Sequence, residues 1–500
     1  MRRDLGLRSG LHEPRTGAAV VALLVAALLA ATLSEWRSAT ATNGVAFAND
    51  FAPMYCAGAI RDRGGNPYLY AEQSVCGGRT DRFIPHSGLD EPAPIPGYGV
   101  ALFGLLAFLP YVVAAALWIV LSLAALLVGA WAVSNMSGLS LPAVFAAFAV
   151  IGGLTDLAYG QLPPIAVGTI AAGAYLASHE RPRTAAIVCS CAMLEPHLGV
   201  PALIGMVVWF PRTRVPVAAI AIVLGIISAV TIGIAGNVEY FAHVLPLQTA
   251  AEADSNIQYS LTWLLHWFGI GDAVASRIGS LDYAVSVLIG VVIARRVAVA
   301  ARCEGLAVLV PPAFALLGGP YIHIFQMLAA LPAALVLATH APRGRALAWT
   351  AVFLLALTWP WILTRALTAL PIVVLVFLST AAFEGASTRV RGIAAVATIA
   401  MFVAINVALA ITPTRVVVHA DSARAFRERI GPLARYSSGV AGINDRERRA
   451  PVANASYRTV AQKIPTWTGL ILLMGLCLTL AASSASRAAP TPVNVGAANT

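Results

Sequence analysis

The sequence predicts an all-α polytopic membrane protein with about 12–13 transmembrane helices, because apolar runs close to the ~20 residues that span a bilayer recur along the chain. Of its 500 residues, 59% are hydrophobic and only 11% are charged, and the mean hydropathy is +0.78. Soluble domains are about 45–50% apolar and about 25% charged. The chain therefore has too few charged side chains to cover a surface that faces water on all sides.

The net charge of +10 comes almost entirely from arginine, since Lys463 is the only lysine. The arginines fall mainly in short connections between apolar runs, as the positive-inside rule expects of cytoplasmic loops, and this pattern argues against a nucleic-acid partner. The connections assigned to the cytoplasm carry Arg181 and Arg183, Arg212 and Arg214, Arg295, Arg296 and Arg302, Arg343 and Arg345, and Arg389 and Arg391. The polar connections between them are then expected outside, on one face.

The first apolar run, residues 17–33, follows four arginines. We expect a retained helix rather than a cleaved signal peptide, whose apolar core usually has ~7–15 residues. A polar loop over residues 34–96 follows and is expected outside the cytoplasm, where its Cys56 and Cys76 could form a disulfide. The sequence leaves the alternative of two unpaired thiols open.

Further candidate spans follow this loop, and several are short or interrupted by proline. They lie near residues 98–134, 141–158, 161–178, 184–210, 215–235, 281–300, 304–318, 321–339, 346–363, 366–383, 391–412 and 466–484. Proline breaks or kinks a span, so the Glu195-Pro196-His197 interruption predicts two half-helices with a polar apex at the outer surface. Around Pro110, one crossing and two crossings both remain open.

Three parts of the chain are distinguished. Residues 1–412 form the transmembrane module, residues 413–465 form an Arg-rich polar loop, and residues 466–500 form the last helix and tail. The Arg-rich loop is placed outside, against the preference of its charges, because long loops follow the positive-inside rule poorly. No internal repeat of the kind found in many transporters is visible.

Asp50 is the first candidate functional residue, because it lies in a chain with few acids, close to where the first span should reach the surface. The apolar spacing after it predicts a short interfacial helix. Asp50 could simply cap that helix, since aspartate is a favoured N-cap residue. The sequence Gly64-Gly65-Asn66-Pro67-Tyr68 predicts a tight turn.

Other polar residues interrupt apolar runs on the side predicted to face outward. They are Gln161, Glu195, His197, Gln258 and His323. Each could be an ordinary polar residue at a helix end. Ionisable groups within a membrane region are nevertheless functional candidates by default, and these positions are expected to converge on one surface with Asp50.

Four stretches in this order resemble the polyprenol-phosphate-mannose-dependent mannosyltransferase-like family, glycosyltransferase family 87 of the GT-C class. The stretches are residues 49–70, 110–127, 159–203 and 318–335, and the resemblance extends over roughly residues 15–410. It implies a GT-C-like helical bundle in the inner membrane, with the active site on the extracytoplasmic face. The partners it implies are a polyprenyl-phosphate-linked sugar donor, a lipid-linked or cell-envelope glycan acceptor, and membrane lipids, with mannose as the favoured sugar.

The resemblance implies that Asp50 is the catalytic base of an inverting transfer, since an attacking hydroxyl must lose its proton. The residues expected to bind substrates are Tyr55, Asn66, Tyr68, Gln161, Glu195, His197, Gln258, His323 and Arg365. Among them, His197, His323 and Arg365 are the candidates for stabilising the phosphate leaving group. Relatives often carry Lys-Pro where this chain has Glu195-Pro196, and "IPGYGV" replaces their Tyr-Pro-Pro, which puts the donor's identity in question.

No cofactor or metal is expected, because the sugar arrives on a lipid and the loop reads Asn49-Asp50-Phe51 rather than Asp-x-Asp. Two other classes stay open. An O-antigen polymerase or ligase would use arginines in a large late loop, and a lipid or sugar transporter would place paired half-helices and charges near the midplane.

Overall fold

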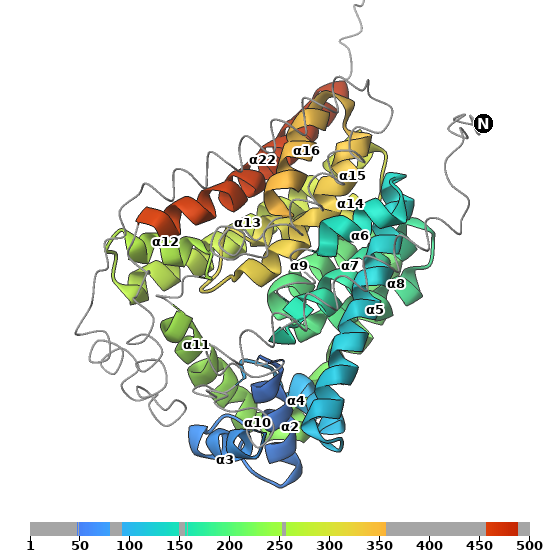
Figure 1. The fold of residues 1–500 in the computed structure, drawn as a ribbon. Coiled ribbons are helices and arrows are strands. Elements are labelled where there is room, and N and C mark those ends of the chain that lie inside the picture. The colour runs from blue at the N-terminus through green and yellow to red at the C-terminus, as the bar shows by residue number, and fades with distance from the viewer. Residues whose placement is uncertain are drawn as a thin grey trace, which may run out of the picture.

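The computed structural model describes residues 48, 50–80, 93–149, 156–157, 159–252, 257–356 and 457–488, and this part of the chain is mostly helical (Figure 1). Within it, the one isolated β-bridge joins Gln258 and His323. The elements are α2 (Phe51–Asp62), α3 (Tyr70–Thr80), α4 (Gly97–Ala107), α5 (Tyr111–Ser137), α6 (Leu141–Phe148), α7 (Pro163–Ser178), α8 (Pro182–Ser190), η2 (Cys191–Leu194), α9 (Pro196–Trp209), η3 (Pro211–Thr213), α10 (Arg214–Glu239), η4 (Tyr240–Val244), α11 (Leu245–Glu252), α12 (Leu261–Trp267), α13 (Asp272–Ala301), α14 (Leu306–Ala315), η5 (Ile324–Ala330), α15 (Leu331–His340), η6 (Pro342–Gly344), α16 (Arg345–Leu355) and α22 (Tyr457–Ala488).

The predicted all-α polytopic membrane fold is confirmed. In the described ranges, four helical segments are long and apolar enough to cross a membrane, namely Tyr111–Ser137, Pro211–Thr249, Ala273–Ala301 and Gln462–Ser484. A fifth is added if Ile324–His340 and Pro342–Leu355, bent by 111°, are one span. The expected spans at 17–33, 366–383 and 391–412 lie outside the described residues.

Two of the expected apolar runs break beside a proline. The run 98–134 divides at Pro110 into the short α4 and the long α5. The run 184–210 divides at Glu195, whose φ of −119° and ψ of 82° are not helical, and α9 then begins at Pro196. The two predicted half-helices are therefore present. The last helix, expected over 466–484, begins earlier, at Tyr457, and continues through Pro465.

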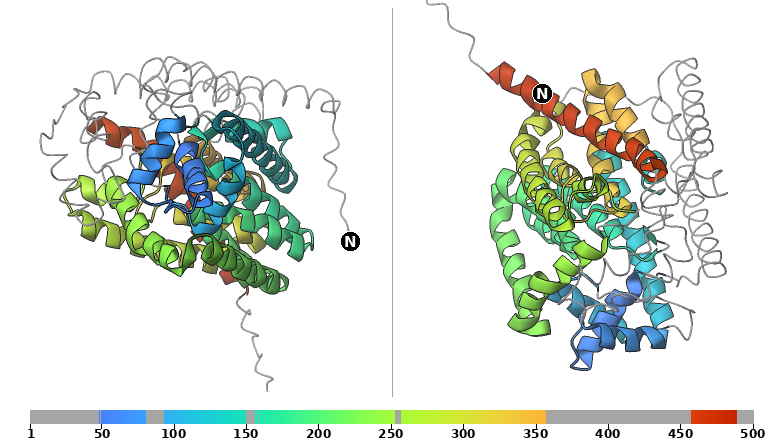
Figure 2. Two further views of the ribbon diagram at one scale, coloured as in Figure 1. Left: turned by 90° about the horizontal axis from the view of Figure 1, so that it is seen from below. Right: turned by 90° about the vertical axis from the view of Figure 1, so that its left-hand side faces the viewer.

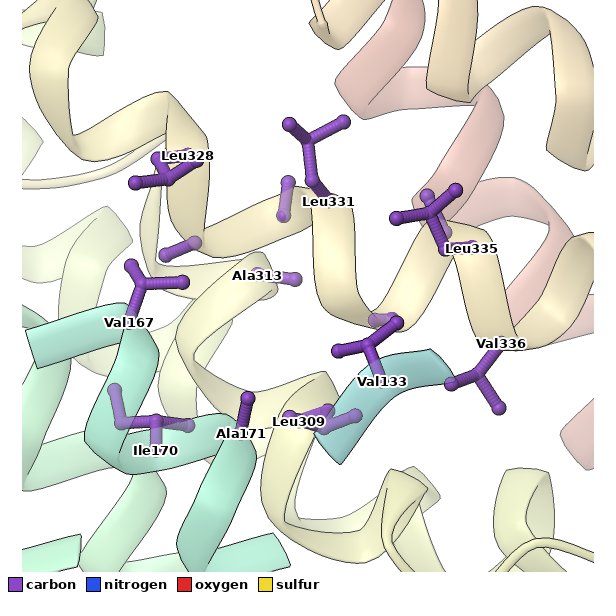
Figure 3. Close-up of a cluster of buried hydrophobic side chains, with 14 of the residues drawn as sticks. Val133, Val167, Ile170, Ala171, Leu309, Ala313, Leu328, Leu331, Leu335 and Val336 are labelled. Atoms are coloured by element: carbon purple, nitrogen blue, oxygen red, sulfur yellow. The ribbon is translucent and has the colours of Figure 1, made fainter. Parts of the chain in front are cut away.

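The core of the bundle lies where α5, α7, α14 and α15 meet. Figure 3 shows Val167 and Ile170 of α7, Leu309 of α14 and Leu331 of α15 within one cluster of buried apolar side chains. α5 and α7 run side by side in the same direction and touch through glycines, because a Cβ added to Gly129 would lie 2.8 Å from the Cα of Gly168. Small residues that let two backbones approach are typical of helix packing in membranes.

A smaller lobe of α2, α3 and α4 covers one end of the bundle beside the C-terminal part of α10 (Figures 1 and 2). A disulfide joins Cys56 of α2 to Cys76 of α3, so of the two alternatives left open by the sequence the structure has the bonded one. Phe51 packs its ring against Phe103 of α4 and Trp118 of α5, with ring centroids 5.8 Å apart in both pairs. The lobe is thereby fixed to the N-terminal end of α5.

We expect Gly168→Ala to destabilise the protein, because the added methyl group would meet the main chain of Ala125 on α5 and force two close-packed backbones apart. Overpacking of this kind costs about 1–3 kcal/mol. Thermal unfolding in detergent is the measurement. Gly225→Ala on α10 is the matched control, since a Cβ added there would have nothing within 4 Å, and it should leave the unfolding temperature unchanged or slightly raised. Equal unfolding temperatures for both variants would contradict close α5–α7 packing.

Candidate active site

Asp50 occupies the N-cap position of α2, but its side chain makes no capping hydrogen bond. Its carboxylate instead accepts a hydrogen bond from Nε2 of Gln161, a residue 111 positions away in sequence. The main-chain N–H of Asp50 donates to the carbonyl of Tyr159 at 2.9 Å. The interpretation of Asp50 as a helix cap is therefore wrong, and the structure joins two of the predicted site residues directly.

Two aromatic donors on α5 hold the turns that carry this pair. The Tyr111 hydroxyl donates to the Ala48 carbonyl at 3.0 Å, and Nε1 of Trp118 donates to the Gly160 carbonyl at 2.9 Å. Gly160 has φ +73°, and a Cβ there would lie 2.8 Å from the Cβ of Phe51. Glycine is the residue that tolerates both this conformation and this approach, so the two turns can sit against each other.

Tyr159 belongs to the turn that carries Gln161, and it was not among the predicted site residues. Burial raises the pKa of Tyr159 to about 12, and the negative charge of Asp50 contributes to the rise. Its phenol is therefore neutral at pH 7 and can serve as a hydrogen-bond donor near the carboxylate.

A second polar group surrounds the break before α9. Oε1 of Glu195 lies 3.3 Å from Nδ1 of His197 and 3.3 Å from Nε2 of Gln326. Gln326 in turn accepts the main-chain N–H of His323 in a capping box at the start of η5. The His197 ring lies against Tyr321, with centroids 4.9 Å apart. Glu195, His197 and His323 are thus brought together as predicted.

Gln326 is the member of this group that sequence reasoning missed. The sequence does contain a signal for Gln326, because a polar N-cap residue followed three positions later by Gln is the pattern of a capping box. The pattern here begins with histidine rather than with the usual serine or threonine, and that concealed it.

The two groups lie at the same end of α7. α7 packs against both η2 and η5, which precede Glu195 and follow His323. The rings of Tyr159 and Phe325 are 6.2 Å apart and connect the groups. α7 begins after Gln161, runs for 16 residues, and ends just before Arg181, so about 24 Å of helix separates the polar groups from that arginine.

Gln258 joins the second group through the main chain. It forms the antiparallel bridge with His323, and it is fully buried. Its main-chain carbonyl accepts a hydrogen bond from Nζ of Lys463 on α22.

Three predicted substrate-binding residues serve the architecture of the lobe. The Tyr55 hydroxyl donates to the Leu109 carbonyl at 2.8 Å, and the Tyr68 hydroxyl donates to the Ile95 carbonyl at 2.9 Å. Nδ2 of Asn66 donates to Glu239 of α10 at 2.9 Å. Each of these contacts holds together the lobe or joins it to α10, and the role of the three residues in substrate binding stays a prediction. Arg365 lies outside the described residues.

The described ranges contain no group of three or more His, Cys, Asp or Glu side chains arranged to hold a metal ion. The described residues instead contain a carboxylate oriented by an amide and, at the same end of α7, a second carboxylate with an imidazole partner. Such groups can accept a proton and hydrogen-bond hydroxyl groups.

One of three comparisons with known proteins found a match. Residues 96–319 match the family model of glycosyltransferase family 87. The matched range contains Gln161, Glu195, His197 and Gln258, whereas Asp50 and His323 lie outside it. No curated protein and no solved structure matches the chain. The match over residues 96–319 bears out the resemblance of this polytopic membrane protein to glycosyltransferase family 87 and indicates that it is a glycosyltransferase.

Proposed function

We propose that the protein transfers a sugar from a polyprenyl-phosphate donor to a lipid-linked or cell-envelope glycan acceptor, by an inverting displacement that needs no metal. Mannose is the favoured sugar, on the resemblance alone. The single observation that carries the proposal is the Asp50 carboxylate, which leaves the end of its own helix uncapped and is bound instead by Gln161. The Gln161 amide has no net charge, so it orients the carboxylate without neutralising it.

In the proposed step, Asp50 takes the proton of an acceptor hydroxyl as its oxygen attacks the anomeric carbon. The new C–O bond forms on the face opposite the phosphate, and the bond from the anomeric carbon to the phosphate oxygen breaks. The electron pair leaves with the lipid phosphate, which is a stable anion and needs no strong general acid. One attack from the opposite face inverts the anomeric configuration.

The phosphate would be stabilised by groups at the same end of the bundle. α2, α7, α9 and η5 all begin beside the polar groups, so their positive ends point toward this region. His197 and His323 lie at the starts of α9 and η5, and Arg365 is retained as a further candidate. Donors and partial positive charges placed around a leaving anion lower the energy of the transition state. Glu195, with its His197 partner, would hydrogen-bond hydroxyl groups of the substrates.

The reaction is placed on the extracytoplasmic face of the inner membrane. α7, α9 and the segment from η5 to α15 each begin at a polar site residue and end just before an arginine-bearing turn. By the positive-inside rule these turns favour the cytoplasm, which puts the polar groups on the other face. The Cys56–Cys76 disulfide supports the same side, since disulfides persist in oxidising compartments.

Asp50→Asn should abolish most turnover while the protein still inserts and folds, because asparagine keeps the main-chain bond to Tyr159 but accepts no proton. The expected loss is about 10²–10⁴-fold. The assay is transfer of radiolabelled sugar from synthetic polyprenyl-phosphate-mannose and polyprenyl-phosphate-arabinose in membranes. Asp62→Asn, an exposed carboxylate on the same helix, is the matched control and should be silent. Equal transfer by wild type and Asp50→Asn would refute the proposed base and favour the polymerase or transporter alternatives.

Gln161→Met should lower kcat with little change in KM for the acceptor, because it keeps the side-chain volume but removes the donor that orients Asp50. A hydrogen bond to a charged group contributes about 1.5–3 kcal/mol, which corresponds to about 10–100-fold in rate. Steady-state kinetics with the same donor is the measurement. A variant with unchanged kcat would mean that the Asp50–Gln161 contact has no part in the reaction.

Cys56 and Cys76 should be found linked in native membranes, and the other four cysteines should be found as thiols. Peptide mapping by mass spectrometry after alkylation, with and without reduction, measures this directly. The Cys56→Ser, Cys76→Ser double variant should lose about 2–4 kcal/mol of stability. Alkylation of Cys56 without prior reduction would argue against the extracytoplasmic placement of the lobe.

A further inference from the structure

The Gln258 carbonyl finds no hydrogen-bond partner within the bridge that Gln258 forms with His323. Tyr259 donates its N–H to the Ile322 carbonyl at 2.6 Å, and Ile324 donates to the Ile257 carbonyl at 2.9 Å. These bonds flank the bridge, so Gln258 and His323 form a non-hydrogen-bonded antiparallel pair. In such a pair the side chains lie closest together, at ~4.5 Å between Cα atoms, and the two residues' own main-chain groups point away from each other. The buried carbonyl of Gln258 therefore needs a partner from elsewhere.

α22 supplies that partner and a second one. Lys463, the only lysine of the chain, donates from Nζ to the Gln258 carbonyl. One turn later, Nε1 of Trp467 donates to the adjacent Tyr259 carbonyl at 2.9 Å. Residues four apart lie on the same face of a helix, so α22 presents both donors to consecutive carbonyls. Figure 1 shows the N-terminal part of α22 beside α12, which follows this segment.

Lys463 is held at this position by aromatic rings. Its Nζ lies 4.2 Å from the ring centroid of Trp263 and 4.4 Å from that of Tyr259. The side chain is fully buried. Moving an ammonium group out of water is costly unless it is hydrogen-bonded or otherwise stabilised, and cation–π contacts provide such stabilisation. We call the group formed by Tyr259, Trp263, Lys463 and Trp467 the clasp.

We propose that Lys463, together with Trp467, is a positioning residue that holds the Gln258–His323 pair in the active site. The inference rests on the proposed function, because it acts through His323. It assigns the last helix, which lies beyond the family match over residues 96–319, to the catalytic module. α22 then helps to hold the active site in place and is not only a membrane anchor.

The first test is a double-mutant cycle on transfer from polyprenyl-phosphate-mannose. Lys463→Met keeps the length of the side chain and removes the donor, and it should lower kcat by about ten-fold or more with KM changed less than kcat. Trp467→Phe keeps a ring and removes the second donor, and it should act in the same direction. Ile464→Ala, an exposed neighbour on α22, should be silent.

The cycle distinguishes positioning from general stability. If Lys463 acts through His323, Lys463→Met should cause little further loss in a His323→Ala background, because residues that act as a unit are non-additive. Additive losses, or a silent His323→Ala, would overturn the inference. Failure of the proposed function is a different result, namely equal transfer by wild type and Asp50→Asn. If Asp50→Asn loses transfer and Lys463→Met does not, the proposed positioning role of Lys463 is wrong and the proposed function stands.

A second measurement needs no activity. Because Lys463 is the only lysine, an amine-reactive reagent applied to native membranes reports on this position, with peptide mass spectrometry separating it from the N-terminal amine. Lys463 should be protected in wild type and should be labelled several-fold faster in Trp467→Phe. Ready labelling of Lys463 in folded wild-type protein would overturn the clasp whatever the enzyme transfers.

Discussion

Two hydrogen bonds from the N-terminal half of α5 hold the turns on which the candidate active site depends. Tyr111 binds the Ala48 carbonyl and Trp118 binds the Gly160 carbonyl, so the segments carrying Asp50 and Gln161 meet across 111 positions of sequence. The close contact of the turns requires glycine at 160. α5 is long enough to span a membrane and packs closely on α7, which makes it a rigid support for a site built on irregular backbone.

The distribution of polar groups follows from what a bilayer permits. Main-chain groups freed where a helix breaks must find partners within the protein, because lipid offers none. At the start of η5, the Gln326 side chain accepts the main-chain N–H of His323. The same side chain reaches Glu195 at the break before α9, where the Glu195 carboxylate also lies beside His197. The same breaks that expose polar groups therefore also gather them, and they do so at one end of the bundle.

The family match and the candidate site overlap only in part. The matched range contains the helices from α4 to α14, together with Gln161 and Glu195. Asp50 precedes it, and His323 and Lys463 follow it. A site assembled from three regions of the chain depends on contacts between those regions, and the main-chain bonds of Asp50 to Tyr159 and of Tyr259 to Ile322 are two of them.

The sequence by itself determined the fold class and the break at Glu195-Pro196, and it named most of the residues that the structure gathers in the candidate site, because hydropathy, proline and scarce polar residues are local properties that a bilayer constrains strongly. It did not decide whether Asp50 caps α2, whether Cys56 and Cys76 are bonded, or that Gln326, Tyr159 and Lys463 belong near the site. Only the tertiary structure decided these points. Each depends on the partner that a side chain meets from a distant segment, and an N-cap position or a buried lysine looks the same in sequence whichever partner it finds.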